Sequence, residues 1–189
     1  MKLKLGDDET VGQTDHLEIR RENEEIRMIS SSLPYILPTN EDIVSDEVKI
    51  TQCSIVDMSG NPLISVEPKQ KVQLLIRVEA QDEIPNAIVG FTVNSIKGIK
   101  VFAGNTYLGT GKTISLGKNS SIMVAFGFEM PMIHSGQYLV SPAVAVGTQE
   151  LHEMKAWYHS PCLFSVPNQK NEIAFLNMEY SSDVYVLTE

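Results

Sequence analysis

Lys71-Val72-Gln73-Leu74-Leu75-Ile76-Arg77-Val78-Glu79-Ala80 is the stretch that decides the fold class. From Val72 to Val78 every second residue is aliphatic, and most positions between them carry polar side chains, among them Arg77. Successive side chains of a β-strand point to opposite faces of the sheet, so a period of two indicates a strand with one buried face. The stretch therefore predicts a β-strand that packs its aliphatic side chains into a core.

Similar segments recur on both sides of this stretch at intervals of roughly ten residues, which is typical of an all-β domain. Turn-forming residues separate them, as in Asp57-Met58-Ser59-Gly60-Asn61-Pro62. Apart from about one turn around residues 149–155, nothing between 48 and 166 follows the 3.6-residue repeat of a helix. The sequence thus predicts an antiparallel β-sandwich or jelly roll. Its expected strands are 48–56, 71–80, 87–94, 100–105, 120–129, 138–146 and 162–166.

The first 45 residues differ from the rest of the chain. Residues 7–27 are dense in charge and follow neither strand nor helix periodicity, and residues 30–42 are rich in serine, proline and other loop formers. We expect residues 1–45 to form a linker or N-terminal arm and residues 46–189 to form the sandwich domain. Residues 172–189 would be a C-terminal extension of that domain, with one or two further strands.

The composition excludes several classes of function. Hydrophobic residues make up 42% of the chain, enough for a core, and no apolar run approaches the roughly 20 residues of a membrane-spanning helix. The net charge of −9 argues against binding to nucleic acid, whose phosphates attract clustered Lys and Arg. The first residues lack the apolar core of a signal peptide, so we expect a soluble protein.

Two cysteines, Cys53 and Cys162, are too few for a disulfide framework, and neither their number nor their spacing suggests zinc. Both fall in expected strands and could face each other across the sandwich. Because no secretion signal precedes them, we expect buried free thiols rather than a bridge. We expect no metal site and no cofactor.

Motifs for catalysis or nucleotide binding are incomplete. The stretch from Gly104 to Thr113 ends in Gly-Lys-Thr, but a phosphate-binding loop needs a glycine where Thr106 stands and a helix afterwards. We interpret it as an inter-strand loop. Neither Gly-x-Ser-x-Gly nor His-Glu-x-x-His occurs, and the acidic residues gather in the arm and in turns. Catalysis is therefore disfavoured, although folding could still bring two carboxylates together as in a glycosidase.

The segment Ala156-Trp157-Tyr158-His159-Ser160-Pro161 holds the only tryptophan, beside a tyrosine and a histidine. Aromatic rings stack on the apolar faces of sugars, and polar neighbours bind the sugar hydroxyl groups. Trp157, Tyr158 and His159 are therefore our first candidates for a carbohydrate-binding site. The alternative is a tryptophan that closes one end of the sandwich.

Arg77, Thr92 and Ser141 are the second candidates, because they occupy strand positions opposite the apolar face. Small residues share these outward positions: Ala125, Gly127 and Ala143. If the strands are neighbours, small side chains there leave a shallow concave face wide enough for a glycan. The same face could equally be covered by the N-terminal arm or by another subunit.

Several segments, in order, match the pattern of a known family. They are residues 48–56, Gly60-Asn61-Pro62, the stretch 71–80, Val89-Gly90-Phe91-Thr92-Val93, Val101-Phe102-Ala103-Gly104-Asn105-Thr106, Ser135-Gly136-Gln137-Tyr138 and Leu163-Phe164-Ser165-Val166. In these segments and their spacing, residues 46–166 resemble the C-terminal domain of Wzt-type proteins. Those proteins are the nucleotide-binding subunits of ABC transporters that export O-antigen polysaccharide.

The resemblance implies an immunoglobulin-like sandwich, usually dimeric, without catalytic activity of its own. It implies binding of lipid-linked O-antigen polysaccharide, in particular the capped non-reducing end, as the recognition domain of an exporter. The partners implied are a second copy of the chain and the transmembrane subunit, at the cytoplasmic face of the inner membrane, with an ATPase domain upstream. The resemblance assigns no binding residues to positions of this chain.

The chain departs from the family pattern at its end, because residues 172–189 run past the usual closing strand. Within them, Asp183-Val184-Tyr185-Val186-Leu187 has the composition of a strand that could pair with a sheet edge of a second subunit. The alternative from another functional class is a structural sandwich whose open face binds protein during assembly.

Overall fold

Strand β3 (Lys71–Ala80) lies at the centre of a three-stranded antiparallel sheet, between β2 (Val48–Val56) and β7 (Ser120–Glu129). The computed structural model describes residues 16–17, 29, 31–168 and 174–176. The aliphatic side chains of β3 that were expected inside are buried, as the period of two predicts.

The second sheet is built around two long antiparallel strands, β4 (Ile84–Ser95) and β8 (Gly136–Gly147). One edge of each long strand pairs with the other long strand. The opposite edge pairs with two shorter strands, one after the other. Strand β4 pairs with β6 (Thr113–Leu116) and then with β5 (Lys100–Asn105), and β8 pairs with β9 (His152–Trp157) and β10 (Cys162–Val166). The short β1 (His16–Leu17) adds to β6 in parallel.

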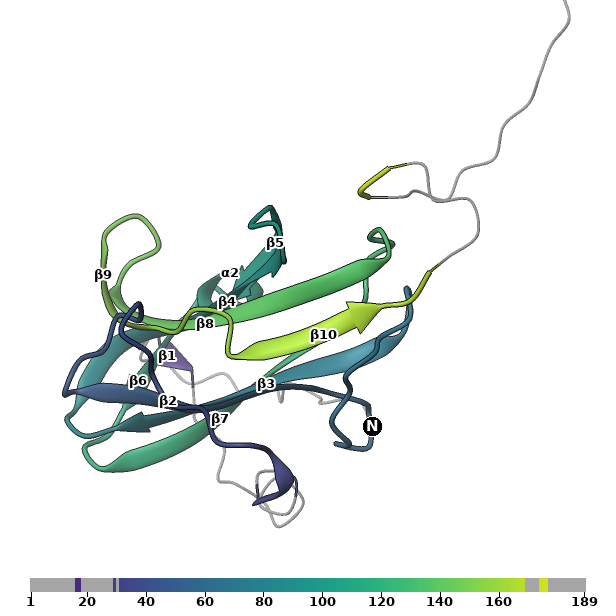
Figure 1. The fold of residues 1–189 in the computed structure, drawn as a ribbon. Coiled ribbons are helices and arrows are strands. Elements are labelled where there is room, and N and C mark those ends of the chain that lie inside the picture. The colour runs from purple at the N-terminus through teal and green to yellow at the C-terminus, as the bar shows by residue number, and fades with distance from the viewer. Residues whose placement is uncertain (1–15, 18–28, 30, 169–173, 177–189) are drawn as a thin grey trace, which may run out of the picture.

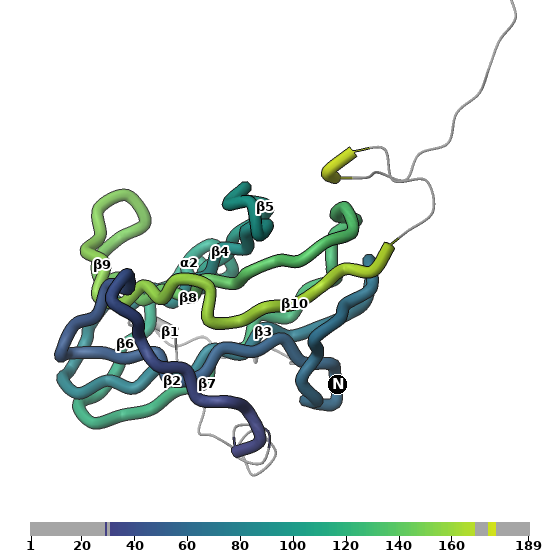
Figure 2. Tube along the Cα trace, viewed as in Figure 1, coloured from purple at the N-terminus to yellow at the C-terminus, as the bar shows by residue number. Residues whose placement is uncertain are grey.

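The two sheets stack face to face and enclose the core (Figures 1 and 2). Phe91 of β4 reaches across the layers to the rings of Phe126 and Phe128 in β7, at centroid distances of 5.0 and 6.3 Å. Cys53 and Cys162, one from each sheet, are buried in the same core as free thiols. The predicted all-β antiparallel sandwich is confirmed.

A β-bulge in β2 changes which of its residues face the core. The register with β3 shifts between Ile50 and Gln52, so the positions that face the main core change from even numbers to Cys53 and Ile55. Gln52 is 1% exposed, and its side-chain amide donates a hydrogen bond of 3.0 Å to the carbonyl of Leu33. The bulge thereby ties the segment before β2 to the sandwich.

Two strands differ from the sequence expectations, because each forms by pairing with another strand of the sheet. Strand β6 has only four residues and was not among the expected strands; it begins at Thr113, where the stretch interpreted as an inter-strand loop ends. Strand β9 contains Glu, Met, Lys and Ala, which favour helices, and its residues were interpreted as part of a helical turn. Pairing with β8 overrides that preference. Between β5 and β6 the chain forms one short helix, α2 (Thr106–Thr110), where the sequence suggested a loop.

The last part of the expected N-terminal arm contacts the sandwich. The Ile36 N–H donates to the Thr51 carbonyl at 2.9 Å, and Leu33 is buried in a small cluster with Val56 and Leu75. Apart from His16–Leu17 and residue 29, residues 1–30 lie outside the described residues, and so does the expected extension 172–189 except for 174–176. None of the helices in the described part is long and apolar enough to cross a membrane.

Candidate functional site

A cavity of about 400 Å³ is lined by outward-facing residues of the seven-stranded sheet. Its lining comes from β4, β5, β8 and β9, from α2, and from the turn between β8 and β9. In Figure 1, the turn beside β9 and the strand β5 rise from the layer that contains β4 and β8. The strands of this sheet therefore supply a floor, and its peripheral elements supply walls.

The floor consists of small side chains because they occupy neighbouring positions on paired strands. Gly90 of β4 lies opposite Ala143 of β8, and Thr92 lies opposite Ser141. A Cβ atom at Gly90 would lie 3.0 Å from the Cβ of Asn105, so glycine allows β5 its close approach. The hollow is thus a direct product of sequence alternation and strand register.

One row of residues crosses four strands and defines the ends of the cavity. Asn105, Gly90, Ala143 and Trp157 are successive partners across β5, β4, β8 and β9. An amide therefore stands at one end and an indole at the other, with two small residues between them. The Asn105 amide donates to the side-chain oxygen of Gln149 at 3.1 Å, which fixes the orientation of this polar end.

The electrostatic character of the cavity differs from that of the chain as a whole. The chain carries a net charge of −9, yet none of the described residues that line the cavity is acidic. Lys100 and His152 are its titratable members. The lining otherwise combines apolar side chains with amides and hydroxyl groups, a composition typical of sites for neutral or anionic polar ligands.

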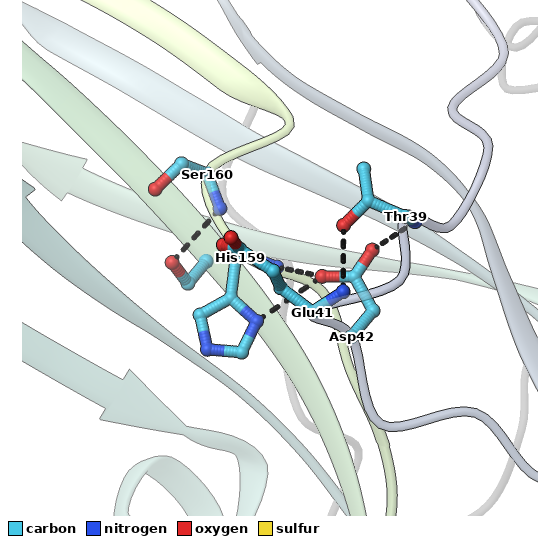
Figure 3. Close-up of polar contacts among 6 residues, drawn as sticks. Thr39, Glu41, Asp42, His159 and Ser160 are labelled. Carbon is cyan, nitrogen blue, oxygen red and sulfur yellow. Dashed lines mark hydrogen bonds and ion pairs between the residues drawn. The ribbon is translucent and has the colours of Figure 1, made fainter.

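Trp157 is held from the side by the segment that precedes β2. Ile43 and Trp157 exchange two backbone hydrogen bonds, each of 2.9 Å. The ring of His159 stacks on the indole, with a centroid distance of 5.3 Å and an interplanar angle of 14°. Asp42 in turn binds His159, as Figure 3 shows.

The carboxylate of Asp42 is 2% exposed, and both of its oxygens have hydrogen-bond partners. Oδ1 accepts the backbone N–H of His159 at 2.6 Å and lies 3.1 Å from its Nδ1, while Oδ2 accepts the N–H of Thr39 at 2.6 Å. Burial alone would raise the pKa of Asp42, but the hydrogen bonds from His159 and Thr39 outweigh it and lower the pKa below its ordinary value of 3.8.

The structure brings together some of the predicted site residues and separates others. Trp157, Thr92 and Ser141 line the cavity, and His159 lies beside it on the indole. Tyr158, however, is 1% exposed, and burial raises the pKa of its hydroxyl. The period of two explains this, because alternate residues of the aromatic segment point to opposite faces.

Arg77 lies apart from this group, which corrects the expectation of one shared open face. It belongs to β3, and its guanidinium contacts Ser121 of β7 at 3.0 Å on the outer face of the three-stranded sheet. Ala125 and Gly127 of β7 accompany it there, whereas Thr92 and Ser141 belong to the other sheet. Alternation identifies outward positions but does not assign strands to sheets.

Other lining residues were not singled out from the sequence. They are Lys100, Asn105, Gln149, His152 and Met154. Only Asn105 stood in a segment used for the family resemblance. The other four stood in no motif. They reach the cavity because β5 pairs with β4, because β9 pairs with β8, and because a turn joins β8 to β9.

Comparisons with known proteins agree with this fold. A family model described as the Wzt C-terminal domain matches residues 40–177. The solved structure of the C-terminal domain of Wzt is similar at a TM-score of 0.71 and 17% identity, over 87% of this chain and 98% of that one.

Two further solved structures are too distant to carry an argument. One is the alkylpurine DNA glycosylase AlkC of Pseudomonas fluorescens bound to abasic-site DNA, with TM-score 0.43, 13% identity, and coverage of 66% of this chain and 31% of that one. The other is a CARDB domain from Pyrococcus furiosus, with TM-score 0.37, 14% identity, and coverage of 67% and 99%. A search of curated proteins gave no match. On the extent of the family match, this chain belongs to the Wzt C-terminal domain family.

Proposed function

We propose that this chain binds O-antigen polysaccharide in the cavity of the seven-stranded sheet, as the substrate-recognition part of an ABC exporter. The observation that carries the proposal is the row Asn105–Gly90–Ala143–Trp157, which places an aromatic wall and an amide on either side of a small-residue floor. Membership of the Wzt C-terminal domain family supports the same function.

The cavity suits a sugar on chemical grounds. A pyranose ring has an apolar C–H face, which stacks on an indole such as Trp157, and a rim of hydroxyl groups, which bind amides such as Asn105 and Gln149. A volume of about 400 Å³ lies in the range of small-ligand sites, so it suits the end of a chain better than a long internal stretch. We therefore include the capped non-reducing end as the recognised feature.

The proposed role is binding without catalysis. Glycoside hydrolysis uses a pair of carboxyl groups on either side of the scissile bond. None of the lining residues in the described part of the chain carries a carboxyl group, which supports recognition rather than cleavage.

The family suggests the cellular setting of the proposal. The polysaccharide would be lipid-linked, and the domain would act at the cytoplasmic face of the inner membrane beside the transmembrane subunit. We further propose a homodimer, because two weak sites on one transporter strengthen the capture of a polymer that reaches both.

Calorimetric titration with capped and uncapped O-polysaccharides tests the proposal through matched pairs of variants. Trp157→Ala removes the wall and should weaken binding about fivefold, since one lost stacking contact is worth roughly 1 kcal/mol. Ala143→Phe fills the floor and should weaken binding at least as much, because its ring occupies the space of the ligand. The controls Arg77→Ala and Ala125→Phe alter the outer face of the other sheet and should bind like the wild type.

Two outcomes would contradict the proposal. Loss of binding in Ala125→Phe with full binding in Ala143→Phe would move the site to the three-stranded sheet. Absence of heat with every polysaccharide, together with a stable complex with a protein partner, would favour the alternative of an assembly module. Equal binding of capped and uncapped polymers would remove the cap from the proposal but leave the cavity in place.

A further inference from the structure

The segment from Thr39 to Glu47 runs along the edge of β9 that faces away from β8. The two hydrogen bonds between Ile43 and Trp157 pair the backbones there, and Lys155 of β9 forms an ion pair of 2.9 Å with Glu47. Three successive contacts thus connect this segment to the aromatic wall: a side-chain pair, a backbone pair and the Asp42–His159 cluster.

Asp42 makes the first of these contacts along the chain. Its own N–H donates to the Thr39 carbonyl at 3.2 Å, and its Oδ2 accepts the Thr39 N–H, so both ends of the turn are closed. Its Oδ1 accepts the His159 N–H, 117 residues away in sequence. The carboxylate therefore joins the turn at Thr39 to the segment that follows β9.

His159 transmits this restraint to the indole. The imidazole lies nearly parallel to the ring of Trp157 and faces Asp42 through Nδ1. An aromatic ring on an open wall has several rotamers available, and one that is already ordered loses less entropy when a ligand stacks on it. Covering one face of the ring and fixing its neighbour favours a single orientation of the wall.

We propose that Asp42 is a positioning residue of the glycan site, which holds His159 and thereby orients the indole of Trp157 toward the cavity. The inference rests on the proposed function and adds a residue that does not touch the ligand. Loss of the restraint should raise the Kd for the polysaccharide by about two- to tenfold, the range expected for one side chain that must be ordered on binding.

A purely structural role for Asp42 is distinguished by a matched carboxylate. Asp57 also accepts backbone N–H groups within a turn, from Ser59 and Asn61, but it follows β2 whereas Asp42 precedes it. Asp57→Ala therefore removes comparable backbone hydrogen bonds, in the turn that follows β2. It should lower the melting temperature without changing the surroundings of Trp157.

Because Trp157 is the only tryptophan, its fluorescence reports on the wall without any ligand. Asp42→Ala should shift the emission to longer wavelength and increase quenching by acrylamide, whereas Asp57→Ala should leave both unchanged. His159→Phe retains a stacked ring and should behave like the wild type more closely than His159→Ala does. Polysaccharide titrations on the same proteins give the affinities.

The outcomes separate the two hypotheses. If Asp42→Ala leaves the quenching and the affinity at wild-type values, the positioning role is wrong even though the wild type binds polysaccharide. If the wild type binds none of the capped polysaccharides, the proposed function is wrong, and the positioning role in glycan binding is wrong with it. Changes in both quantities in Asp42→Ala, with neither in Asp57→Ala, support the inference.

Discussion

At the scale of single residues, Asp42 shows how one buried carboxylate serves both the fold and the candidate site. A carboxylate with three donors is stabilised in its charged form, and removing it leaves those donors without their acceptor. The sequence alone did not single it out, because it lies in a loop-like stretch that was grouped with the expected arm. Its partner His159 was predicted as a site residue, yet the contact between them joins positions that only folding brings together.

The stability contributed by Asp42 should depend on pH. Its pKa is lowered in the folded protein, so its contribution is fully present above the unfolded value of 3.8 and disappears as the pH falls through the folded value. Asp42→Ala should therefore cost about 1–3 kcal/mol at pH 7 and less at pH 3. Urea unfolding at both pH values measures this. Glu41→Ala, at the exposed neighbouring residue, is the control and should change the stability little at either pH. A loss in Asp42→Ala that is equal at both pH values would contradict the prediction.

At the scale of elements, the turn between β8 and β9 decides where the aromatic wall stands. Strand β9 was not predicted, because its residues favour a helix and only pairing with β8 makes it a strand. Strand β3 was predicted with its bounds, because its alternation is long and regular. The candidate site combines both cases: its floor follows from alternation, and its walls depend on elements with weak local signals.

Gly147→Ala should disturb this turn. Gly147 has a φ of +130°, and an added Cβ would lie 2.5 Å from the carbonyl oxygen of Leu151. Backbone strain of this kind costs about 1–3 kcal/mol, and relief of the clash should displace β9 and weaken polysaccharide binding. Gly109→Ala, where a Cβ meets open space, is the matched control. Thermal unfolding and titration measure both effects; unchanged binding in Gly147→Ala would show that the wall tolerates movement of the turn.

At the scale of the whole molecule, the aromatic contacts between Phe91, Phe126 and Phe128 hold the two sheets together. Each of these residues occupies an alternate position of an expected strand, and the sandwich places it against the core. What alternation did not supply is the assignment of strands to sheets, which separated Arg77 from Thr92 and Ser141. That assignment depends on long-range pairing, for which a local pattern contains no information.

Phe91→Ala should reduce the free energy of unfolding by about 3–5 kcal/mol, because the ring is 7% exposed and packs against two rings of the opposite sheet. The half-buried Phe102, whose ring lies 6.3 Å from that of Phe91, should cost less when truncated in the same way. Denaturant unfolding compares the two variants. Equal losses would indicate that the edge of the sandwich near β5 is packed as tightly as its centre.

The two thiols should react only when the sheets separate. Cys53 and Cys162 are buried in the core, and the hydrogen bond from Cys53 to Cys162, together with burial, raises the pKa of the Cys53 thiol. Labelling by a thiol reagent in native buffer should therefore be slow and should accelerate at the denaturant midpoint that fluorescence reports. Rapid labelling of either cysteine without denaturant would contradict this prediction.

The paired hydrogen bonds between Ile43 and Trp157 also have a mechanical consequence. The chain passes this pair before it enters β2, so a pulling force on the leading segment reaches the edge of β9 once the contacts of Leu33 and Ile36 with β2 have broken. Tension from that direction and a ligand pressing on the indole would act on the same two hydrogen bonds. The wall of the cavity is therefore one of the restraints that a pull on the leading segment must overcome before it reaches β2 along the chain.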